Sequence, residues 1–435
     1  MRIAIIAMGT RGDVQPYIAL GKGLKAAGHF VRLITHENFE TLVTSHRLNF
    51  GSVKGNVQEV LESPEMLKLL ERGNFLAINA HTGKMVKDIA IDWARDGLAA
   101  CQGMDLIIAG VGGLYLAISL AEKLNIPLQQ AYIFPFTPTT AFPAILLPQS
   151  ISRLGGTVNR LSHHLFRQVM WQGFQKADRL ARQQVLNLPP APFWGSYDSP
   201  ILHEHPTLYG FSPSVIPKPA DWYNTQVTGY WFLDEAVDWT PSAALTNFLG
   251  SGAPPVYIGF GSMGSRKPAE TTDLVLESLA RTGQRAILQS GWGGLKKTNL
   301  PETVFMVDSI SHSWLFPRMA AVVHHGGAGT TAAGMRAGVP SIVIPFFGDQ
   351  LFWGQRVEAV GVGTAPIPRK QLTVELLAQA IHTAVTDRVM RQRAANLGAK
   401  IQTEDGITNA VRAIESTTVS GASPWDSLSN RREGR

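Results

Sequence analysis

The sequence predicts an α/β protein with two doubly wound domains, each built on a parallel sheet packed among helices. Three observations predict this fold. Short apolar runs alternate with stretches of helical periodicity, which is the pattern of parallel βαβ units. The alternation stops between residues 212 and 240, where prolines and aromatic residues take over, and then resumes. A length of 435 residues is also typical of two domains rather than one.

The individual elements follow from the apolar runs in chain order. In the first half, these runs predict strands at residues 3–8, 30–35, 106–109 and 128–133, and a first helix at 16–27 with Pro16 at its start. In the second half, they predict strands at residues 256–259, 286–289, 304–307, 321–324 and 341–344. The expected division is a first domain over 1–220, a second over 221–400, and a C-terminal segment over 401–435. In that segment we expect a helix that returns to the first domain, followed by a flexible tail.

The composition excludes several classes of protein. Charged residues make up 17% of the chain and apolar residues 45%, which excludes an intrinsically disordered protein. The net charge is +6, but no run of Lys and Arg is present, so no nucleic-acid partner is expected. A single cysteine, Cys101, excludes a disulfide framework and favours a reducing, cytoplasmic location. The apolar run at residues 3–8 is too short for a secretory signal, and no transmembrane helix is predicted.

Three glycine-rich turns follow predicted strands, at residues 9–16, 259–264 and 324–331. Ligands of doubly wound sheets bind beyond the carboxyl ends of the strands, so these turns mark the expected site. The turn at 259–264 matches the dinucleotide fingerprint G-x-G-x-x-G, with Glu277 as an acidic residue downstream. An NAD-dependent oxidoreductase is therefore one remote alternative.

The third turn, HHGGAGTT, has the composition of a pyrophosphate cradle. Glycines let backbone N–H groups approach an anion, and a helix predicted from Thr330 would point its N-terminus at that anion. His325 adds a hydrogen-bond donor or a positive charge, and Thr330 and Thr331 add hydroxyl groups. The lysine of a P-loop is absent, which excludes a P-loop NTPase site. The alternative interpretation is a tight connection between strand and helix with no ligand.

Asp349 and Gln350 follow the next predicted strand. A carboxylate beside a carboxamide suits hydrogen bonding to neighbouring hydroxyl groups of a sugar. Asp349 is also placed to cap a helix that runs through Val360, and the two roles are compatible.

With these motifs in place, the chain resembles a known family. Residues 305–363 resemble the donor-binding signature of family-one nucleotide-sugar glycosyltransferases of the GT-B fold. Within them, HHGGAGTTAAGMRAGVPSIVIPFFGDQLFWGQRVEAVGVG is especially similar to the signature of the sterol 3β-glucosyltransferase branch. Residues 9–29, GTRGDVQPYIALGKGLKAAGH, and 255–262, PVYIGFGS, resemble the first loop and the first C-terminal strand of the same enzymes. Residues 51–221 have no close match. The resemblance implies two Rossmann-like domains that face each other across a cleft, with the acceptor bound by the N-terminal domain and the donor by the C-terminal domain.

The resemblance also implies an activity. This is the inverting transfer of glucose from UDP-glucose to a hydroxyl group of a sterol or similar lipophilic acceptor, by a monomer that uses no cofactor. The absence of an Asp-x-Asp motif likewise argues against a metal-dependent transferase. Two alternatives stay open beside the oxidoreductase. One is an antibiotic- or polyketide-type glycosyltransferase that uses a UDP- or dTDP-sugar, and the other is a nucleotide-sugar-binding protein without catalysis.

Site residues are implied at the positions that match the family's motifs. Asp13 would be the catalytic base, and Thr10 and Arg11 would close over the donor. The remaining donor-binding residues would be Ser262 and His325 near the phosphates, Ser309 and His312 at the uridine, Ala328, Gly329 and Thr330 at the diphosphate, and Asp349 and Gln350 at the glucose hydroxyls. Ala333 stands where plant members of the family carry a ribose-binding glutamate, so the ribose contact is unassigned.

The acidity of Asp13 is a separate question. A carboxylate just before a helix that begins at Pro16 should have a lowered pKa, because the helix dipole favours its ionised form. Such an Asp13 would be a weak base that acts through its position. The alternative is that Asp13 serves only as the N-cap of the helix.

The basic charge of the chain is concentrated in one segment. Residues 123–177 contain no Asp or Glu and carry a charge of +5. Within this segment Val158, Leu161, Leu165 and Val169 recur at helical spacing, and in and just beyond it lie Arg153, Arg160, Arg167, Lys176, Arg179 and Arg182. A basic amphipathic helix can lie on an anionic membrane. We therefore expect either peripheral membrane contact through residues 134–182 or an ordinary helix that packs on the core and exposes its arginines.

Overall fold

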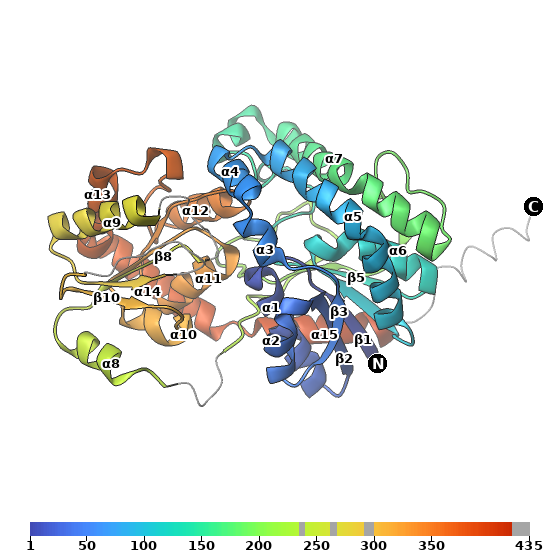
Figure 1. The fold of residues 1–435 in the computed structure, drawn as a ribbon, viewed down its shortest axis with the longest axis horizontal. Coiled ribbons are helices and arrows are strands. Elements are labelled where there is room, and N and C mark those ends of the chain that lie inside the picture. Colours follow the sequence, from blue (N-terminus) through green and yellow to red (C-terminus); the bar gives the residue numbers. More distant parts are fainter. Residues whose placement is uncertain (235–239, 262–267, 291–299, 420–435) are drawn as a thin grey trace, which may run out of the picture.

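The computed structural model describes residues 1–234, 240–261, 268–290 and 300–419. In this part of the chain, the strands form two sheets, one in each half of the sequence, and the strand pairings within them are parallel. Figure 1 shows the two sheets side by side, each packed among helices. The predicted fold class is therefore confirmed.

The strands and helices have the following bounds. The N-terminal sheet contains β1 (Arg2–Ile6), β2 (Phe30–His36), β3 (Asn49–Val53), β4 (Leu106–Ala109), β5 (Leu128–Tyr132), β6 (Thr207–Tyr209) and β7 (Thr225–Val227). The C-terminal sheet contains β8 (Val256–Gly259), β9 (Ala286–Gln289), β10 (Val304–Val307), β11 (Ala321–His324) and β12 (Ser341–Val343). The helices are α1 (Arg11–Ala26), α2 (Glu40–Ser45), α3 (Val57–Glu62), α4 (Pro64–Arg72), α5 (Phe75–Cys101), α6 (Leu114–Leu124), α7 (Gly156–Ala181), α8 (Ala243–Gly250), α9 (Pro268–Thr282), α10 (His312–Leu315), α11 (Ala328–Ala337), α12 (Gln350–Ala359), α13 (Val374–Thr386), α14 (Arg388–Thr403) and α15 (Gly406–Val419). Within the described ranges, none of these helices combines the length and the apolar character needed to cross a membrane.

The order of the strands creates one switch point in each sheet. The N-terminal order is β3-β2-β1-β4-β5-β6-β7, so the chain winds outward from β1 and then crosses to β4 on the other side. The C-terminal order is β10-β9-β8-β11-β12, with the same reversal between β8 and β11. A crevice for ligands forms at the carboxyl ends of the strands where the winding reverses. The three glycine-rich turns follow β1, β8 and β11 and therefore lie at these two points.

All nine predicted strands are present within two residues of their predicted bounds. Strands β3, β6 and β7 were not predicted, because β6 and β7 are only three residues long and β3 has Gly51 at its centre. Strand β7 lies inside residues 212–240, the stretch that the sequence marks as the connection between the domains, and it joins the N-terminal sheet. A strand of three residues can be predicted where it lies in a longer apolar run, as β12 does, but Thr207 in β6 and Thr225 and Gln226 in β7 interrupt such a run.

The first helix begins earlier than the sequence predicts. Helix α1 begins at Arg11 rather than Pro16, because Thr10 is extended at the N-cap position and its carbonyl accepts the N–H groups of Asp13 and Val14. Pro16 therefore lies inside the helix. In the same way α11 begins at Ala328 rather than Thr330. Asp13 is the third residue of α1 in the N-terminal half, and Thr330 is the third residue of α11 in the C-terminal half.

The C-terminal helix packs on the N-terminal half. Helix α15 lies against α1, and Ala410 and Ile414 are buried in the apolar cluster that contains β1 and α1 (Figure 1). The contact is close because a Cβ atom on Gly23 would lie 2.3 Å from Cγ2 of Ile407. Residues 420–435 lie outside the described residues.

The two halves share an apolar interface. The ring of Phe142, after β5, lies 6.0 Å from that of Phe352 on α12, and the ring of Phe211 lies 6.4 Å from that of Trp353. These rings belong to one continuous cluster with members from both halves. Packing between the halves therefore sets the distance across which their site residues face each other.

Helix α7 exposes the apolar face that its sequence pattern defines. Leu161 and Leu165 are 64% and 62% exposed. Near Leu161 and Leu165 its buried side carries the polar residues Asn159, Ser162 and His163, which are hydrogen-bonded to the backbone of the segment after β5, whereas further along the helix Trp171, Ala177 and Ala181 are buried. The interpretation that the Leu161 face packs on the core is therefore wrong, because the polar anchors occupy the buried side.

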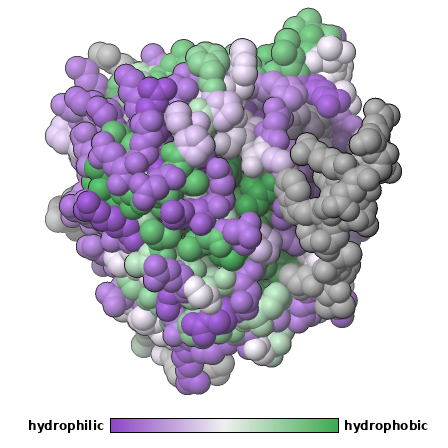
Figure 2. All heavy atoms as spheres, turned by 90° about the vertical axis from the view of Figure 1, so that its right-hand side faces the viewer, coloured by the Kyte–Doolittle hydropathy of each residue, from purple (hydrophilic) through white to green (hydrophobic). Residues whose placement is uncertain are grey.

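Two of the basic residues in this region are not solvated. Arg167 Nε donates to Phe136 O at 3.2 Å, and Arg182 is 3% exposed with its Nη1 atom 2.8 Å from Glu122 Oε2. The exposed basic residues are Arg153, Arg160, Lys176 and Arg179. Figure 2, which looks onto the right-hand side of Figure 1, shows patches of hydrophobic surface among hydrophilic surface.

Candidate functional site

Asp13 is held in place by the turn that precedes α1. Gly9 has a φ of +140°, and a Cβ atom there would lie 2.4 Å from Asp13 Oδ2, so the carboxylate fills space that only glycine leaves open. The backbone N–H and the hydroxyl of Thr10 both donate to Oδ2, at 2.7 and 2.9 Å. The carboxylate is therefore oriented through this one oxygen.

Burial changes the acidity of Asp13. Loss of water around the carboxylate raises its pKa, and this effect exceeds the lowering by the two hydrogen bonds from Thr10. The expected lowering by the helix dipole is therefore wrong in direction for this residue. The interpretation of Asp13 as the N-cap is also wrong, because Thr10 occupies that position. A raised pKa makes Asp13 a stronger base than a solvated aspartate.

The ring of His325 lies between two glycine-rich turns. A Cβ atom on Gly261 would lie 3.0 Å from its Cε1 atom, and one on Gly327 would lie 2.5 Å from its Nε2 atom, so both glycines make room for the imidazole. Burial lowers the pKa of His325 to about 4. The ring is therefore neutral at pH 7 and is not the cation that the sequence also allowed. Its Nδ1 atom is buried and has no partner among the described residues.

Helix α11 presents its N-terminus beside His325. Its N-cap is Gly327, which has no side chain to bond the first N–H groups of the helix. These N–H groups belong to Ala328, Gly329 and Thr330, and they have no acceptor within the helix. Thr331 is fully buried and its hydroxyl donates to Gly327 O at 2.9 Å, so it supports the turn rather than a ligand.

The N-termini of α1 and α11 lie next to each other. The two helices are in contact, and Ala328 packs against the apolar cluster that contains β1 and α1. The catalytic candidate Asp13 therefore lies near the predicted diphosphate cradle, although more than 300 residues separate the two in the sequence.

Asp349 lies at the N-cap position of α12, after β12, but its side chain makes no capping hydrogen bond to the start of the helix. Its Oδ2 atom accepts a hydrogen bond from Trp353 Nε1 at 2.8 Å. Burial, and to a smaller extent the negative charge of Asp13, raise the pKa of Asp349 to about 7. This carboxyl group therefore titrates near neutral pH.

Gln350 uses one end of its amide to shape the preceding loop. Its Oε1 atom accepts from the backbone N–H groups of Phe346 and Phe347 at 2.7 and 3.1 Å. The two bonds occupy both lone pairs of that oxygen.

His312 lies close enough to Arg11 of the N-terminal half for the charge of Arg11 to affect its pKa. Its ring stacks on Phe316 at 4.3 Å between centroids, and its Nε2 atom lies 3.3 Å from the Tyr257 hydroxyl. Burial, followed by the positive charge of Arg11 and the proximity of the His325 ring, lowers the pKa of His312 to about 4. Ser309, three residues earlier in the same loop, is exposed. Arg11 of the N-terminal half therefore lies close to the predicted uridine loop.

The structure brings most of the predicted residues into one region. Arg11 and Asp13 face His312 and Asp349 closely enough to change their pKa values, and His325 lies close to His312. Ser262 lies outside the described residues. Among the described residues, no group of three or more His, Cys, Asp or Glu side chains could hold a metal ion.

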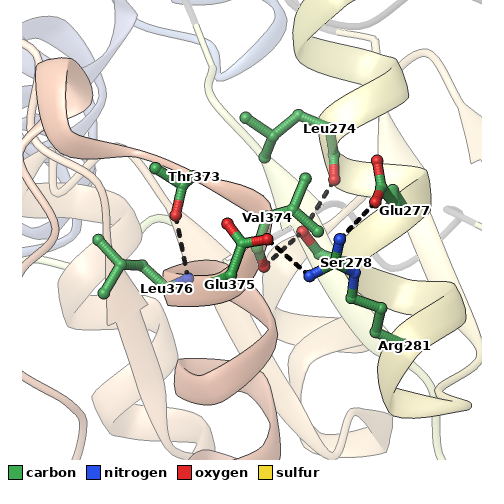
Figure 3. Close-up of polar contacts among 8 residues, drawn as sticks. All are labelled: Leu274, Glu277, Ser278, Arg281, Thr373, Val374, Glu375 and Leu376. Carbon is green, nitrogen blue, oxygen red and sulfur yellow. Dashed lines mark hydrogen bonds and ion pairs between the residues drawn. The ribbon is translucent and has the colours of Figure 1, made fainter.

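Glu277, the acidic residue expected to serve a dinucleotide site, forms an ion pair with Arg281. Glu277 Oε1 accepts from Arg281 Nη2 at 2.6 Å, and Arg281 Nη1 donates to Glu375 Oε1 at 2.7 Å (Figure 3). Ser278 Oγ donates to the carbonyls of Leu274 and Val374 in the same contact between α9 and α13. Glu277 therefore helps to join two helices, and the oxidoreductase alternative loses its supporting acid.

Some residues that position the site were not predicted. Trp353 holds Asp349, and Phe316 supports the ring of His312. Each lies four residues after the residue that it supports, on the same side of a helix. This spacing is a sequence signal, but it becomes informative only once the helices are known to begin at Gln350 and His312.

Family models match both halves of the chain. Residues 3–143 match the glycosyltransferase family 28 N-terminal domain. Residues 273–416 match the C-terminal domain described as erythromycin biosynthesis protein CIII-like. The matched segments contain the turns after β1 and β11 and the start of α12.

Relatives with similar sequences are sterol 3-beta-glucosyltransferases. The protein UGT80B1 of Arabidopsis thaliana is 39% identical over 429 residues, which cover 95% of this chain and 68% of the plant protein. The sterol 3-beta-glucosyltransferase of Cryptococcus neoformans var. neoformans serotype D (strain JEC21) is 39% identical over 440 residues, which cover 95% of this chain and 27% of the fungal protein. The chain thus spans about a quarter of the length of this fungal relative.

Solved structures with a similar fold are glycosyltransferases of natural-product pathways. The kitacinnamycin glycotransferase has a TM-score of 0.67 at 18% identity, covering 96% of this chain and 98% of its own. The calicheamicin glycosyltransferase CalG4 has a TM-score of 0.66 at 16% identity, covering 97% and 99%. SsfS6 of Streptomyces sp. SF2575, solved with thymidine diphosphate, has a TM-score of 0.62 at 20% identity, covering 96% and 99%. At these identities the likeness shows a shared fold.

Proposed function

Because the chain belongs to the sterol 3-beta-glucosyltransferase family and has the GT-B fold, we propose that it transfers glucose from UDP-glucose to a hydroxyl group of a sterol or similarly lipophilic acceptor, with inversion at the anomeric carbon. The observation that carries this proposal is the approach of Asp13 and Asp349 from different halves of the molecule. An acceptor held by the N-terminal half and a sugar held by the C-terminal half would meet between these carboxyl groups.

Asp13 would act on the acceptor. As the acceptor oxygen attacks the anomeric carbon, Asp13 would take the proton of the hydroxyl group, and the bond from that carbon to the UDP oxygen would break on the opposite face. General-base assistance of this kind accelerates a reaction by roughly 10²–10⁴-fold. The raised pKa of Asp13 favours the role, because a stronger base accepts the proton more readily.

The start of α11 and His325 would stabilise the leaving UDP. Negative charge develops on its phosphate oxygens, and fixed N–H donors in a site with little water stabilise such charge strongly. The N–H groups of Ala328, Gly329 and Thr330 have no acceptor within the helix. The buried Nδ1 atom of His325 is a further candidate, because a phosphate oxygen would supply the partner that it lacks among the described residues.

The remaining residues would hold the two ends of the donor. Asp349 would accept hydrogen bonds from the glucose hydroxyls while Trp353 holds its Oδ2 atom. Gln350, the next residue along the chain, would lie beside it at the glucose hydroxyls. Ser309 and His312 would lie against the uridine, with Thr10 and Arg11 closing from the N-terminal half. The reaction so described needs no metal ion or cofactor.

A second candidate function is transfer to a polyketide or another natural product. The observation that favours it is the fold likeness to natural-product glycosyltransferases, one of them solved with thymidine diphosphate. Under this proposal a dTDP-sugar would replace UDP-glucose. The two candidates differ in both donor and acceptor, so one assay can separate them.

The test is turnover of the purified chain with a panel of donors and acceptors. UDP-glucose and dTDP-glucose would each be supplied with a sterol dispersed in detergent, a flavonoid and a macrolide, with and without EDTA. We expect steryl glucoside from UDP-glucose at a rate that EDTA does not change. Product from dTDP-glucose with the macrolide alone would favour the second candidate, and hydrolysis of the donor without any glycoside would contradict both.

A further inference from the structure

Large apolar side chains gather on the exposed side of α7. Leu161 and Leu165 lie on successive turns of this helix, and Leu154, in the 3₁₀ segment Gln149–Leu154 before it, is 70% exposed. Phe193 and Trp194, in the loop that follows α7, are 60% and 69% exposed. We call these five residues the apolar stripe. Their exposure has no explanation in the fold, because the buried side of the helix is anchored by polar groups.

One carbonyl ties the loop to the helix and makes the stripe continuous. Phe193 O accepts hydrogen bonds from Gln168 Nε2, Trp171 Nε1 and Gln172 Nε2 at 3.3, 2.9 and 3.2 Å. Positions 161, 165, 168 and 172 follow at spacings of four, three and four, so they share one face of α7. The aromatic pair Phe193 and Trp194 therefore continues the line that Leu161 and Leu165 begin.

Basic residues accompany the stripe. Arg153 and Arg160 are exposed beside its leucines. At the other end, a cavity of about 590 Å³ between α5 and α7 is lined by Gln168 and Gln172, which also hold the loop, and by three exposed lysines, Lys84, Lys87 and Lys176.

Acidic residues near this surface are few. The sequence has no Asp or Glu between residues 123 and 177. Asp178, just after that range, accepts a hydrogen bond from buried Ser119 and interacts with buried Arg182. Asp198 lies close enough to His164 for its negative charge to oppose the lowering of that histidine's pKa by burial, and Asp88 follows Lys87 in the sequence. The exposed charge around the stripe is therefore mainly positive.

We propose that the apolar stripe and its basic surroundings form the surface by which the protein docks on an anionic phospholipid bilayer. Leucine, phenylalanine and tryptophan side chains would enter the boundary between headgroups and acyl chains, where the amphipathic ring of tryptophan is favoured. The arginines and lysines would face the lipid phosphates. The proposal does not require the proposed function, although a lipophilic acceptor would be supplied from the same bilayer.

The test is flotation of the full chain with vesicles of phosphatidylcholine alone or with 30% phosphatidylserine. We expect binding to the anionic vesicles that weakens with added salt, because surface charges are screened. Changing Leu161→Ser together with Leu165→Ser should weaken binding at least about tenfold, since two leucine side chains lose their transfer into the bilayer. Arg160→Glu together with Lys176→Glu should weaken binding to the anionic vesicles only.

Matched variants on the C-terminal half provide the control. Leu376 and Val389 are 42% and 60% exposed, and Arg388 and Lys400 are exposed on α14. Serine at the first pair and glutamate at the second should leave vesicle binding unchanged. Absence of binding by the unchanged chain, or equal loss in the stripe and control variants, would overturn the proposal. Turnover of a detergent-dispersed sterol should be unaffected by the stripe variants, so a failed membrane proposal remains distinct from a failed function.

Discussion

The charge of Asp13 affects the ionisation of Asp349 although the two residues belong to different halves of the chain. The negative charge of Asp13 contributes to raising the pKa of Asp349 to about 7, and burial raises the pKa of Asp13 itself. Two carboxyl groups in this arrangement resist carrying two negative charges at once. The relationship links the predicted base to the predicted sugar-binding residue.

Replacing Asp13 with asparagine should abolish most of the activity. The variant keeps an oxygen that can accept the Thr10 N–H, so the turn before α1 should fold normally. It cannot take up a proton, and we expect kcat to fall by roughly 10²–10⁴-fold. Steady-state kinetics with UDP-glucose and a sterol, beside thermal melting by circular dichroism, is the measurement. A rate near that of the unchanged chain, with an unchanged melting curve, would exclude the base role.

Donor binding should depend on pH through Asp349. Its pKa is raised to about 7, so the carboxylate is ionised above that pH and protonated below it, and affinity for UDP-glucose should fall as the pH drops through 7. In the Asp13→Asn variant the midpoint should move to lower pH, because the neighbouring negative charge is gone. Titration calorimetry between pH 5 and 9 measures both curves. Asp349→Asn is the control and should bind weakly with no step near pH 7; a midpoint unchanged by Asp13→Asn would contradict the coupling.

His325 should act as a neutral hydrogen-bond donor. Because its pKa is lowered to about 4, the free protein holds it uncharged at pH 7, and the charge of a bound diphosphate should raise that pKa. His325→Gln, which keeps an N–H donor, should retain more affinity for UDP than His325→Ala. Loss of one hydrogen bond to a charged group corresponds to about 10–100-fold. Equal affinities of the two variants, measured by calorimetry, would argue against this contact. His382→Ala, at an exposed residue of α13, serves as the control.

The position of the His325 ring can also be tested by changing the glycine that makes room for it. Gly327 has a φ of −60°, which alanine adopts easily, but a Cβ atom there would lie 2.5 Å from His325 Nε2. Gly327→Ala should therefore displace the ring and lower affinity for UDP by about tenfold, the cost of one hydrogen bond to a charged group, with little loss of stability. Gly250→Ala is the control, because a Cβ atom at that position meets no atom within 4 Å. Unchanged UDP binding by Gly327→Ala would show that the position of the ring does not matter.

The contact between α1 and α15 predicts a compensating pair of substitutions. A Cβ atom on Gly23 would overlap Ile407, and overpacking of this kind costs about 1–3 kcal/mol, more than the ~1 kcal/mol that alanine gains over glycine inside a helix. Gly23→Ala should lower the free energy of unfolding, and adding Ile407→Ala should restore part of it. Urea unfolding of the two single variants and the double variant gives the coupling. Strict additivity would mean that α15 does not pack on α1 as described.

Much of the fold could be predicted from local patterns. The nine predicted strands are short buried apolar runs between polar or glycine-rich stretches. This signal lies in the residues of each strand and does not depend on distant parts of the chain. Strands β6 and β7 leave no such signal, because their three residues include Thr207 in one and Thr225 and Gln226 in the other and so form no apolar run. The start of α1 was misplaced because Pro16 is typical of a first helical turn, whereas the bonds of Thr10 extend the helix over five further residues.

Part of the candidate site could likewise be predicted from the sequence, and part could not. The glycine-rich turns at 9–16 and 324–331 and the pair Asp349 and Gln350 could be recognised from their own residues, since each follows a strand and carries the polar groups that a nucleotide sugar needs. The direction of the Asp13 pKa shift could not be predicted, because desolvation by residues distant in sequence outweighs the local helix dipole. The same holds for the pKa values of His312 and His325.

By itself, the sequence determined the α/β class, the strands, the positions of the glycine-rich turns and the family resemblance, because each of these is written in a continuous stretch of residues. Only the tertiary structure decided which carboxyl groups face each other, which histidines are neutral and which side of α7 meets solvent. These properties depend on burial and on charges contributed by both halves of the chain. Leu161 and Leu165 illustrate the difference: their spacing predicts an apolar face, but only the polar anchors on the opposite side of α7 turn that face outward.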